Sequence, residues 1–307
     1  MIIEEAAALI ARHCPRLVVD SIERLGEGDF CVAYLVNNEW VFRFAKHERA
    51  AASLRREACL LPLISGRFDL RIPSPQLMDA GRSCALMRYP LLPGPALTRE
   101  RYLRLSEAER ERCAAQVAGF LAQLHAIEVS VAGRCGVEVA DYSAKYEGLL
   151  VRAHEQFFEK LAGPEQAFVE RTVEGYLNSQ ARCAFEPSLL HGDLSPDHVL
   201  YDERTPRVTA IIDFGDMVIG DPAWDLVFIY EDYGLDFFAR LLRRYAAGES
   251  VALIERAYRF YVLAAIEWAV ASAEEGAADF DEAVAQVGQL RARGEQEFQE
   301  LLRACLK

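Results

Sequence analysis

A segment rich in proline and glycine, PLLPGPALT at residues 90–98, separates two parts of the sequence that differ in character. Before this segment the pattern is mainly that of short strands, and after it mainly that of helices. With 307 residues, the chain is longer than a single hydrophobic core usually supports. We therefore expect two lobes, residues 1–90 and residues 91–307, with a ligand cleft between them.

The first part is predicted to form an antiparallel sheet with one main helix. Residues 3–13 have the apolar spacing of a short helix. Between residues 18 and 46, runs rich in β-branched and aromatic residues are separated by the turn sequences GEGD and NNE. A helical pattern at residues 49–64 follows, and then two more strand-like runs, IPSPQLMDAG and SCALMRYPLL. This part should be a small β-rich lobe.

The second part is predicted to be mostly helical. The stretch ERERCAAQVAGFLAQLHAIEV places an apolar stripe on one face of a helix, and this stripe consists of Cys113, Val117, Phe120, Leu121 and Leu124. Residues 141–183 and 235–307 also have helical patterns. The predicted fold class is therefore α+β, with a small antiparallel N-terminal lobe and a larger helical C-terminal lobe.

The composition indicates which classes of partner and which cellular compartment to expect for this protein. A net charge of −13 makes a nucleic-acid-binding surface unfavourable and favours cationic partners, metal ions among them. The eight cysteines include no CxxC pair, so we expect reduced thiols in a cytoplasmic protein rather than a zinc site. The N-terminus lacks the cationic region of a signal peptide, and no run of eighteen uncharged apolar residues predicts a membrane span.

Two motifs carry the candidate chemistry: HGDLSPDHVLYD at residues 191–202 and IIDFGD at residues 211–216. Asp193 and His198 are five residues apart, and Asp213 follows His198 by fifteen residues. The sequence between His198 and Asp213 reads as strand, turn and strand, so a hairpin should bring Asp213 back toward the other two. Phosphoryl transfer uses such a set, because one carboxylate accepts the proton of the attacking hydroxyl while other ligands hold Mg²⁺.

These motifs resemble those of the antibiotic phosphotransferases, which are relatives of the protein kinases and their H-R-D-x-x-x-x-N and D-F-G motifs. The resemblance covers nearly the whole chain and implies a bilobal protein-kinase-like fold. It also implies that Asp193 is the catalytic base and that Asp213 is the principal Mg²⁺ ligand. His198 stands where the protein-kinase pattern has asparagine, as in aminoglycoside 2″-phosphotransferases and macrolide phosphotransferases, and is the second predicted metal ligand.

Four other polar residues near these motifs are interpreted separately. We expect His191 to hold the loop by packing and hydrogen bonding, and Asp197 to be a turn residue outside the site. Asp225 resembles the family aspartate that braces the catalytic loop. For Asp216, contact with metal or with substrate stays open.

The resemblance implies that the first lobe binds ATP or GTP. Gly26 and Gly28 lie in LGEGDFCVAYLV, which resembles a glycine-rich phosphate-binding loop but has Cys31 at the place of a third glycine. Arg43 takes the position of the usual strand lysine. Lys46, three residues further along, points to the other face of a regular strand and is the alternative phosphate contact.

Two further contributions to the nucleotide site are expected. Glu57 shares a helical face with apolar residues, so it needs a charged partner, for which we predict Arg43. The purine is expected at the hinge around residues 87–92, with Met87 and Tyr89 in the site. The sequence does not distinguish adenine from guanine.

The proposed acceptor is a cationic aminoglycoside, because EDYGLDFFARLLRRYA resembles the aminoglycoside 2″-phosphotransferases, which hold their substrate with acidic residues. The candidate substrate-binding residues are Asp193, Glu231, Asp232 and Glu267. In the simpler interpretation, Glu231 and Asp232 only open the following helix, where acidic side chains favour the helix dipole.

Two alternatives are retained. The stretch YRFYVLAAIEWAVASAEEG is apolar enough to suggest a macrolide phosphotransferase or another small-molecule kinase, although core packing explains it as well. A nucleotide-binding protein of the same fold without activity is the third hypothesis, and the presence of both Asp193 and Asp213 argues against it.

Overall fold

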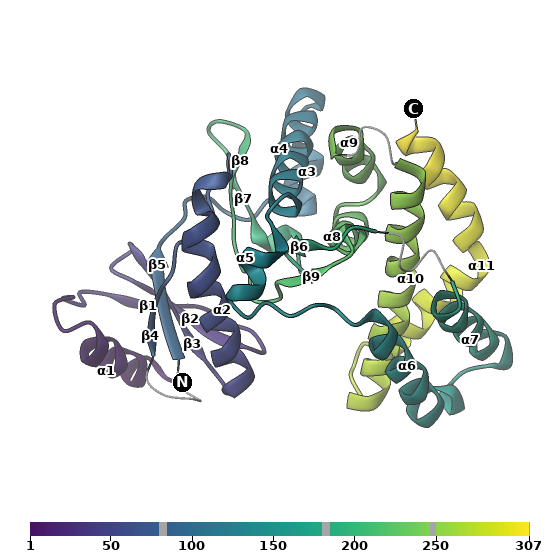
Figure 1. The fold of residues 1–307 in the computed structure, drawn as a ribbon, viewed down its shortest axis with the longest axis horizontal. Helices are drawn as coiled ribbons and strands as arrows, with labels where there is room; N and C mark the ends of the chain where they lie inside the picture. The colour runs from purple at the N-terminus through teal and green to yellow at the C-terminus, as the bar shows by residue number, and fades with distance from the viewer. Residues whose placement is uncertain (80–84, 180–184, 246–249, 307) are drawn as a thin grey trace.

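The computed structural model describes residues 1–79, 85–179, 185–245 and 250–306. Its β-sheet and first helices lie at one end of the molecule, and the last helices of the chain lie at the opposite end (Figure 1). This arrangement confirms the predicted α+β class with a β-rich first part and a helical second part. The predicted turn between the last two strands of the first part, together with Cys84 and Cys183, lies outside the described residues.

The N-terminal sheet is antiparallel throughout, with strand order β1-β2-β3-β5-β4. Its strands are β1 (Ile22–Glu27), β2 (Cys31–Val36), β3 (Trp40–Ala45), β4 (Gln76–Asp79) and β5 (Ala85–Pro90). The first three strands confirm the predicted meander. Arg43 on β3 pairs with Met87 on β5, and Val41 pairs with Tyr89, so the register places these residues side by side.

A helix covers each face of this sheet. Helix α1 (Ile3–His13) contributes Ala6 and Ile10 to a cluster with Tyr34 and Phe42. Helix α2 (Glu48–Ile64) contributes Ala51 and Leu54 to a cluster with Val41, Met87 and Tyr89. Because strand side chains alternate between faces, these two clusters are separate.

Helix α2 also reaches the second lobe. The His47 side chain caps its start by accepting a hydrogen bond from the amide of Ala50 at 3.1 Å. Near its end, Leu60, Leu61 and Ile64 are buried in the large C-terminal core. The short 3₁₀ turn η1 (Ser65–Arg67) follows. The same helix therefore packs against the sheet with its first half and against the C-terminal lobe with its second half.

The connection between the two parts requires glycine at one point. Gly94 has φ of +114°, and a Cβ atom there would lie 2.4 Å from the carbonyl oxygen of Tyr201. After this close approach, Thr98 caps helix α3 (Arg99–Arg104). Strand β5 ends at Pro90. The division into lobes at residues 90 and 91 stays a prediction.

The second part consists mainly of helices around one large core that includes Phe120, Phe214 and Phe260. Its helices are α4 (Glu107–His125), α5 (Val129–Arg134), α6 (Tyr142–Arg152), α7 (Gly163–Leu177), α8 (Asp225–Phe228), α9 (Leu235–Tyr245), α10 (Ser250–Glu275) and α11 (Phe280–Cys305). Short turns link them: η2 (Ala153–Phe157), η3 (Phe158–Lys160), η6 (Pro222–Trp224) and η7 (Ile229–Tyr233). Helices α6, α7, α10 and α11 lie farthest from the sheet (Figure 1).

Two small antiparallel pairs interrupt the helices. Strand β6 (Ser188–Leu190) pairs with β9 (Val218–Gly220), and β7 (Val199–Asp202) pairs with β8 (Arg207–Ile211). The pairing of β7 with β8 is the predicted hairpin between the two motifs. It is confirmed, and it returns the chain to the turn η5 (Pro196–His198).

The expectation that all cysteines are reduced thiols is wrong for two of them. Cys59 on α2 and Cys135 after α5 form a disulfide, with their Cα atoms 5.6 Å apart. They are 76 residues apart in the sequence, so no local pattern shows that they meet. The other described cysteines are free and buried: Cys14, Cys31, Cys113 and Cys305. Across the described ranges, no helix has both the length and the apolar character needed to cross a membrane.

Candidate active site

A cleft of about 960 Å³ lies between the sheet and the two motif loops. This volume is at the upper end of the usual range for small-molecule sites. Its lining includes most residues predicted for the site, namely Gly26, Gly28, Arg43, Tyr89, Asp193, His198 and Asp213. The remaining predicted residues are described but lie outside this lining: Glu57, Met87, Glu231, Asp232 and Glu267.

A buried carboxylate holds the loop that carries Asp193 by binding two of its backbone amides. Asp225 accepts hydrogen bonds from the backbone amides of His191 at 2.9 Å and Gly192 at 2.8 Å. Gly192 has φ of +89°, and a Cβ atom there would lie 2.1 Å from the carbonyl oxygen of Asp216. The loop therefore requires glycine at this position, and Asp225 has the bracing role expected from the sequence.

His191 fixes the same loop from inside. Its Nε2 lies 3.0 Å from the carbonyl oxygen of Ile212, and its Nδ1 accepts from the amide of Asp193. A carbonyl only accepts, so Nε2 carries the proton and the ring is neutral. Burial lowers the pKa of His191, which agrees with a neutral ring. His191 is thus a structural residue that links the two motifs, as expected.

Asp193 projects from this braced loop into the cleft. Partial burial raises its pKa, and the charges of Asp216 and Asp213 raise it further, while His198 acts in the opposite direction. A carboxylate with a raised pKa is a better proton acceptor than an ordinary surface aspartate. The geometry and the pKa therefore suit the predicted role of a base.

His198 lies between the two predicted catalytic carboxylates. Its Nδ1 donates to the backbone carbonyl of Asp193 at 2.7 Å, which leaves the lone pair on Nε2. Nε2 lies 3.7 Å from Oδ2 of Asp213. The hydrogen bond at Nδ1 therefore orients the ring so that Nε2 faces the second carboxylate.

Asp213 has a strained backbone. Its φ is +60°, in the left-handed region that a non-glycine residue seldom adopts and that costs about 1 kcal/mol or more. Partial burial raises the pKa of Asp213, but the charge of Arg43 lowers it below the ordinary value. Asp213 is therefore an ionised carboxylate held in an unusual conformation beside His198.

Arg43 connects the sheet, helix α2 and the second motif. Its Nη1 donates to Glu57 at 2.9 Å and its Nη2 donates to Asp213 at 2.9 Å. Burial raises the pKa of Glu57 to about 7 against the opposing effect of Arg43. The predicted pairing of Glu57 with Arg43 is present, and it places the guanidinium at the back of the cleft.

Lys46 does not compete with Arg43 for this position. Its Nζ binds Glu27 at 2.8 Å and the carbonyl oxygen of Gly28 at 3.1 Å. Lys46 therefore closes the glycine-rich turn between β1 and β2, whereas Arg43 lines the cleft. The choice of Arg43 over Lys46 as the phosphate contact stays a prediction.

The other side of the cleft is apolar. Leu25, Val41, Tyr89, Leu91 and Leu200 contribute to its lining. Met87 faces helix α2 and is buried in the cluster between sheet and helix. The cleft therefore combines apolar and polar lining residues, and Tyr89 rather than Met87 contributes to that lining.

Two further carboxylates line the cleft: Asp216, for which contact with metal or substrate was left open, and Asp197, which was interpreted as a turn residue outside the site. Asp197 lies on the turn η5 between Asp193 and His198, and this position brings it to the cleft. Asp232 on η7 lies nearby. Burial raises its pKa to about 6, and the charges of Glu231, Asp193 and Asp197 also raise it.

We call Asp193, Asp197, Glu231 and Asp232 the acidic surface. Glu267 is placed differently, because its carboxylate binds Nζ of Lys145 at 2.8 Å. Lys145 in turn lies 4.3 Å from the centre of the Trp224 ring. Asp232 lies near Asp193 and Asp197, whereas Glu231 accepts a hydrogen bond from Gln286 on α11 and Glu267 is held in its ion pair.

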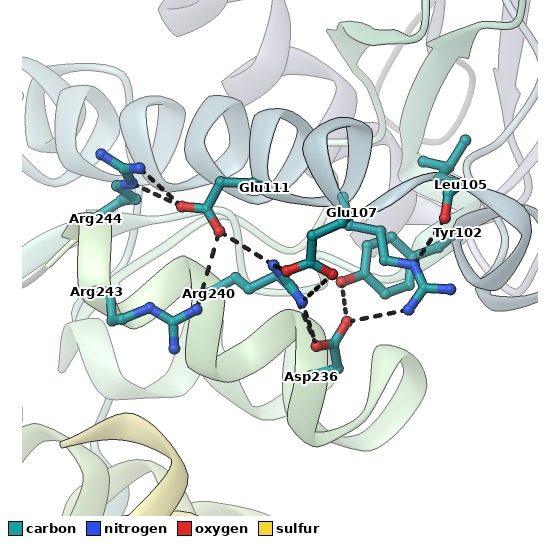
Figure 2. Close-up of polar contacts among 9 residues, drawn as sticks. Tyr102, Leu105, Glu107, Glu111, Asp236, Arg240, Arg243 and Arg244 are labelled. Carbon is teal, nitrogen blue, oxygen red and sulfur yellow. Dashed lines mark hydrogen bonds and ion pairs between the residues drawn. The ribbon is translucent and has the colours of Figure 1, made fainter. Parts of the chain in front are cut away.

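An ion-pair network fixes the start of helix α9, which follows the turn η7 that carries Glu231 and Asp232. Asp236, at the start of α9, accepts hydrogen bonds from Tyr102 at 2.6 Å and from Arg240 at 2.9 Å (Figure 2). Arg240 also binds Glu107 and Glu111 on α4 (Figure 2). Because η7 ends three residues before Asp236, this network fixes the chain directly after Glu231 and Asp232.

The residues present fit a magnesium ion. Asp213 supplies an ionised oxygen and His198 turns Nε2 toward it at 3.7 Å, so these two side chains would hold Mg²⁺, which would neutralise phosphate charge there. Within the described ranges, no group of three or more His, Cys, Asp or Glu residues is arranged to hold a metal by itself.

Comparison with known proteins gives consistent matches. A model described as Phosphotransferase enzyme family matches residues 24–261. Viomycin phosphotransferase from Streptomyces vinaceus is 26% identical over 248 residues, which cover 78% of this chain and 83% of that protein. The GDP complex of wild-type aminoglycoside 2'-phosphotransferase-IIIa has a TM-score of 0.86 at 28% identity, covering 95% of this chain and 99% of that chain.

A second solved structure is similar in fold alone. The apoenzyme of macrolide 2'-phosphotransferase MphH from Brachybacterium faecium has a TM-score of 0.69 at 23% identity, covering 92% of this chain and 96% of that chain. Together with the first structure, it confirms the predicted bilobal protein-kinase-like fold.

Proposed function

The chain belongs to the phosphotransferase enzyme family, and from this premise we propose that it transfers the γ-phosphate of ATP or GTP to a hydroxyl group of an aminoglycoside antibiotic. The similar protein at 28% identity is an aminoglycoside phosphotransferase with GDP bound, which supports both the donor and the acceptor class. We place the reaction in the cytoplasm, where nucleoside triphosphates are available.

The acidic surface is the observation that carries the choice of acceptor. Burial raises the pKa of Asp232, and repulsion from Glu231, Asp193 and Asp197 raises it further. A bound polycation relieves this repulsion, because each ammonium group compensates neighbouring carboxylates. Since Asp193 belongs to the same surface, a cation held there has its hydroxyl groups next to the proposed base. Glu267 contributes only if the acceptor displaces Lys145.

In the proposed reaction, Asp193 orients the acceptor hydroxyl and accepts its proton. The acceptor oxygen forms a bond to the γ-phosphorus, the bond from phosphorus to the bridging oxygen breaks, and the nucleoside diphosphate leaves. Asp213 and His198 would hold Mg²⁺, which neutralises phosphate charge when bound. Arg43 contacts the phosphates through Nη2 while Nη1 stays on Glu57, and Gly26 and Gly28 bring backbone amides close to them.

The burial of helix α10 weakens the argument for a macrolide acceptor. The apolar stretch that suggested it belongs to α10, in which Leu263, Ile266 and Val270 are fully buried in the core. Their apolar character is therefore explained by packing. We retain macrolides as an outcome of the test and not as a second proposal.

The test is nucleoside diphosphate release by the purified protein with Mg²⁺ and either GTP or ATP. Aminoglycosides including kanamycin, viomycin and macrolides are added separately, and Asp193→Asn serves as the inactive control. Release that depends on an aminoglycoside supports the proposal and identifies the donor. Release with macrolides alone reassigns the acceptor, and nucleotide binding without release for any compound contradicts the proposal.

A further inference from the structure

The disulfide between Cys59 and Cys135 joins the helix of the nucleotide-binding lobe to the C-terminal lobe. Cys59 lies on α2 with an exposed side chain, and Cys135 is the residue that follows α5. Figure 1 shows the end of α5 beside α2. Small thiols in solution can therefore reach this bond, whereas the free cysteines of the described ranges are buried.

Helix α2 carries residues that position two parts of the candidate site. Glu57 holds Arg43 at 2.9 Å. One turn earlier, the Ser53 hydroxyl donates to the carbonyl oxygen of Gly215 at 2.7 Å, within the loop of Asp213. Both side chains are almost completely buried. A displacement of α2 would therefore disturb the phosphate contact and the metal loop together.

The covalent link lies close to these contacts. Cys59 is two residues beyond Glu57 on the same rigid helix, so a bond at Cys59 limits how far Glu57 can move. Beside the disulfide, Arg56 pairs with Glu138 at 3.5 Å, but Glu138 is 81% exposed, and such surface pairs contribute little. Apolar packing at the end of α2 resists separation of the lobes. The disulfide adds the one covalent constraint seen between α2 and the described C-terminal lobe.

We propose that Cys59 and Cys135 form a thiol-oxidation site whose disulfide holds α2 in the position in which Glu57 and Ser53 support nucleotide binding. This inference rests on the proposed function, because it assigns the cleft to a nucleoside triphosphate. Cytoplasmic disulfides are commonly transient and redox-sensing. The protein then binds nucleotide more tightly under oxidising conditions than under reducing conditions.

The oxidation is a thiol–disulfide exchange with a low-molecular-weight disulfide such as oxidised glutathione. The thiolate of Cys59 attacks one sulfur of this oxidant and releases one small thiolate, which leaves a mixed disulfide on the protein. The thiolate of Cys135 then attacks Sγ of Cys59 and releases the second small thiolate. The two protein thiols lose two protons and two electrons, and the oxidant is reduced to two small thiols.

The experiment uses the full chain with Cys84→Ser and Cys183→Ser, so that no thiol outside the described residues contributes. Protein treated with oxidised glutathione is compared with protein treated with dithiothreitol. Peptide mapping by mass spectrometry identifies the cross-link, and calorimetry measures the Kd for GTP and ATP with Mg²⁺. Cys59→Ser and Cys135→Ser remove the bond, and Arg56→Ala is the matched control that removes only the neighbouring ion pair.

We expect a cross-link between the peptides of Cys59 and Cys135 in the oxidised sample alone. Reduction should weaken nucleotide binding by about fivefold, which is the lower end of typical coupling between sites. It should also lower the Tm by roughly 5–10 °C, because the disulfide closes a long loop. Both serine variants should match the reduced protein under either treatment, and Arg56→Ala should respond as the parent does.

Three results overturn the inference while leaving the proposed function standing. One is the absence of the cross-link after oxidation. Another is an equal nucleotide Kd in both redox states, with the cross-link present. A third is a redox response that persists in Cys59→Ser. If neither state binds any nucleotide, the proposed function itself fails, and the inference falls with it. That result differs from the second one, in which nucleotide binds equally well in both states.

Discussion

His125 and Asp225 are 100 residues apart in the sequence, yet Nε2 of His125 lies 3.0 Å from Oδ2 of Asp225. Nδ1 of the same ring contacts the hydroxyl of Tyr245 at 2.6 Å. Asp225 also accepts hydrogen bonds from the backbone amides of His191 and Gly192. The geometry of the catalytic loop therefore depends on helices α4, α8 and α9 at the same time.

Asp225→Asn should lower both stability and activity. The side-chain NH₂ of the new asparagine would face N–H groups that now donate to the Asp225 carboxylate. We therefore expect a loss of about 2 kcal/mol in the free energy of unfolding. A shifted loop should reduce kcat by about tenfold or more. Urea unfolding and steady-state kinetics measure these effects. Glu203→Gln, an exposed surface change, is the control, and an Asp225 variant that behaves like it would contradict the bracing role.

Asp193→Asn should remove the base without removing the nucleotide site. We expect kcat to fall by about 10²–10⁴-fold, the usual contribution of a general base. The Kd for nucleotide should stay within about twofold, because Arg43 and the glycine-rich turn are unchanged. Single-turnover kinetics and calorimetry separate the two quantities. Full activity in this variant would exclude Asp193 as the base.

Asp213→Asn should raise the Mg²⁺ concentration that nucleotide binding requires. The substitution removes the ionised oxygen that faces His198, so the Mg²⁺ concentration for half-maximal nucleotide binding should rise by about tenfold or more. Removal of Mg²⁺ by a chelator should abolish activity of the parent protein. A nucleotide titration at several Mg²⁺ concentrations is the measurement. An unchanged metal dependence would reject Asp213 as a ligand.

The sequence predicted which candidate residues lie near one another where these residues are close along the chain. Asp193, His198 and the hairpin to Asp213 lie within 21 residues, so strand and turn patterns were enough to bring them together. The pairing of Arg43 with Glu57 could also be predicted from the sequence, because a carboxylate on an apolar helix face requires a cation. Such inferences succeed because local periodicity fixes the direction of each side chain.

The sequence predicted less where distant elements meet. The disulfide of Cys59 with Cys135 depends on how α2 lies against α5, which no spacing in the chain encodes. Glu267 was expected at the substrate, but Lys145 is its neighbour only after α6 packs against α10. Asp197 was excluded because an exposed aspartate in a turn has the same local pattern whether or not it lines a cleft.

Glu57→Gln tests the charge that supports Arg43. Without that charge, the guanidinium should be held less firmly, and the KM for nucleotide should rise by about tenfold, equivalent to ~1.4 kcal/mol. The KM for the antibiotic should change little, because Glu57 is remote from the acidic surface. Glu48→Gln, at the exposed start of the same helix, is the control. A larger effect on the antibiotic than on nucleotide would contradict the assignment.

Asp236 should make stability depend on pH in the acid range. Burial raises its pKa, but hydrogen bonds from Arg240 and Tyr102 lower it below the ordinary value (Figure 2). A carboxyl with a lowered pKa in the folded state stabilises the fold above its unfolded pKa of about 3.9 and loses this contribution as the pH falls through the folded value. Asp236→Asn should therefore be less stable than the parent at pH 7, and this difference should shrink by pH 3. Urea unfolding at both pH values measures it, with the exposed Glu128→Gln as control, and a difference that is the same at both pH values would show that the Asp236 charge does not contribute.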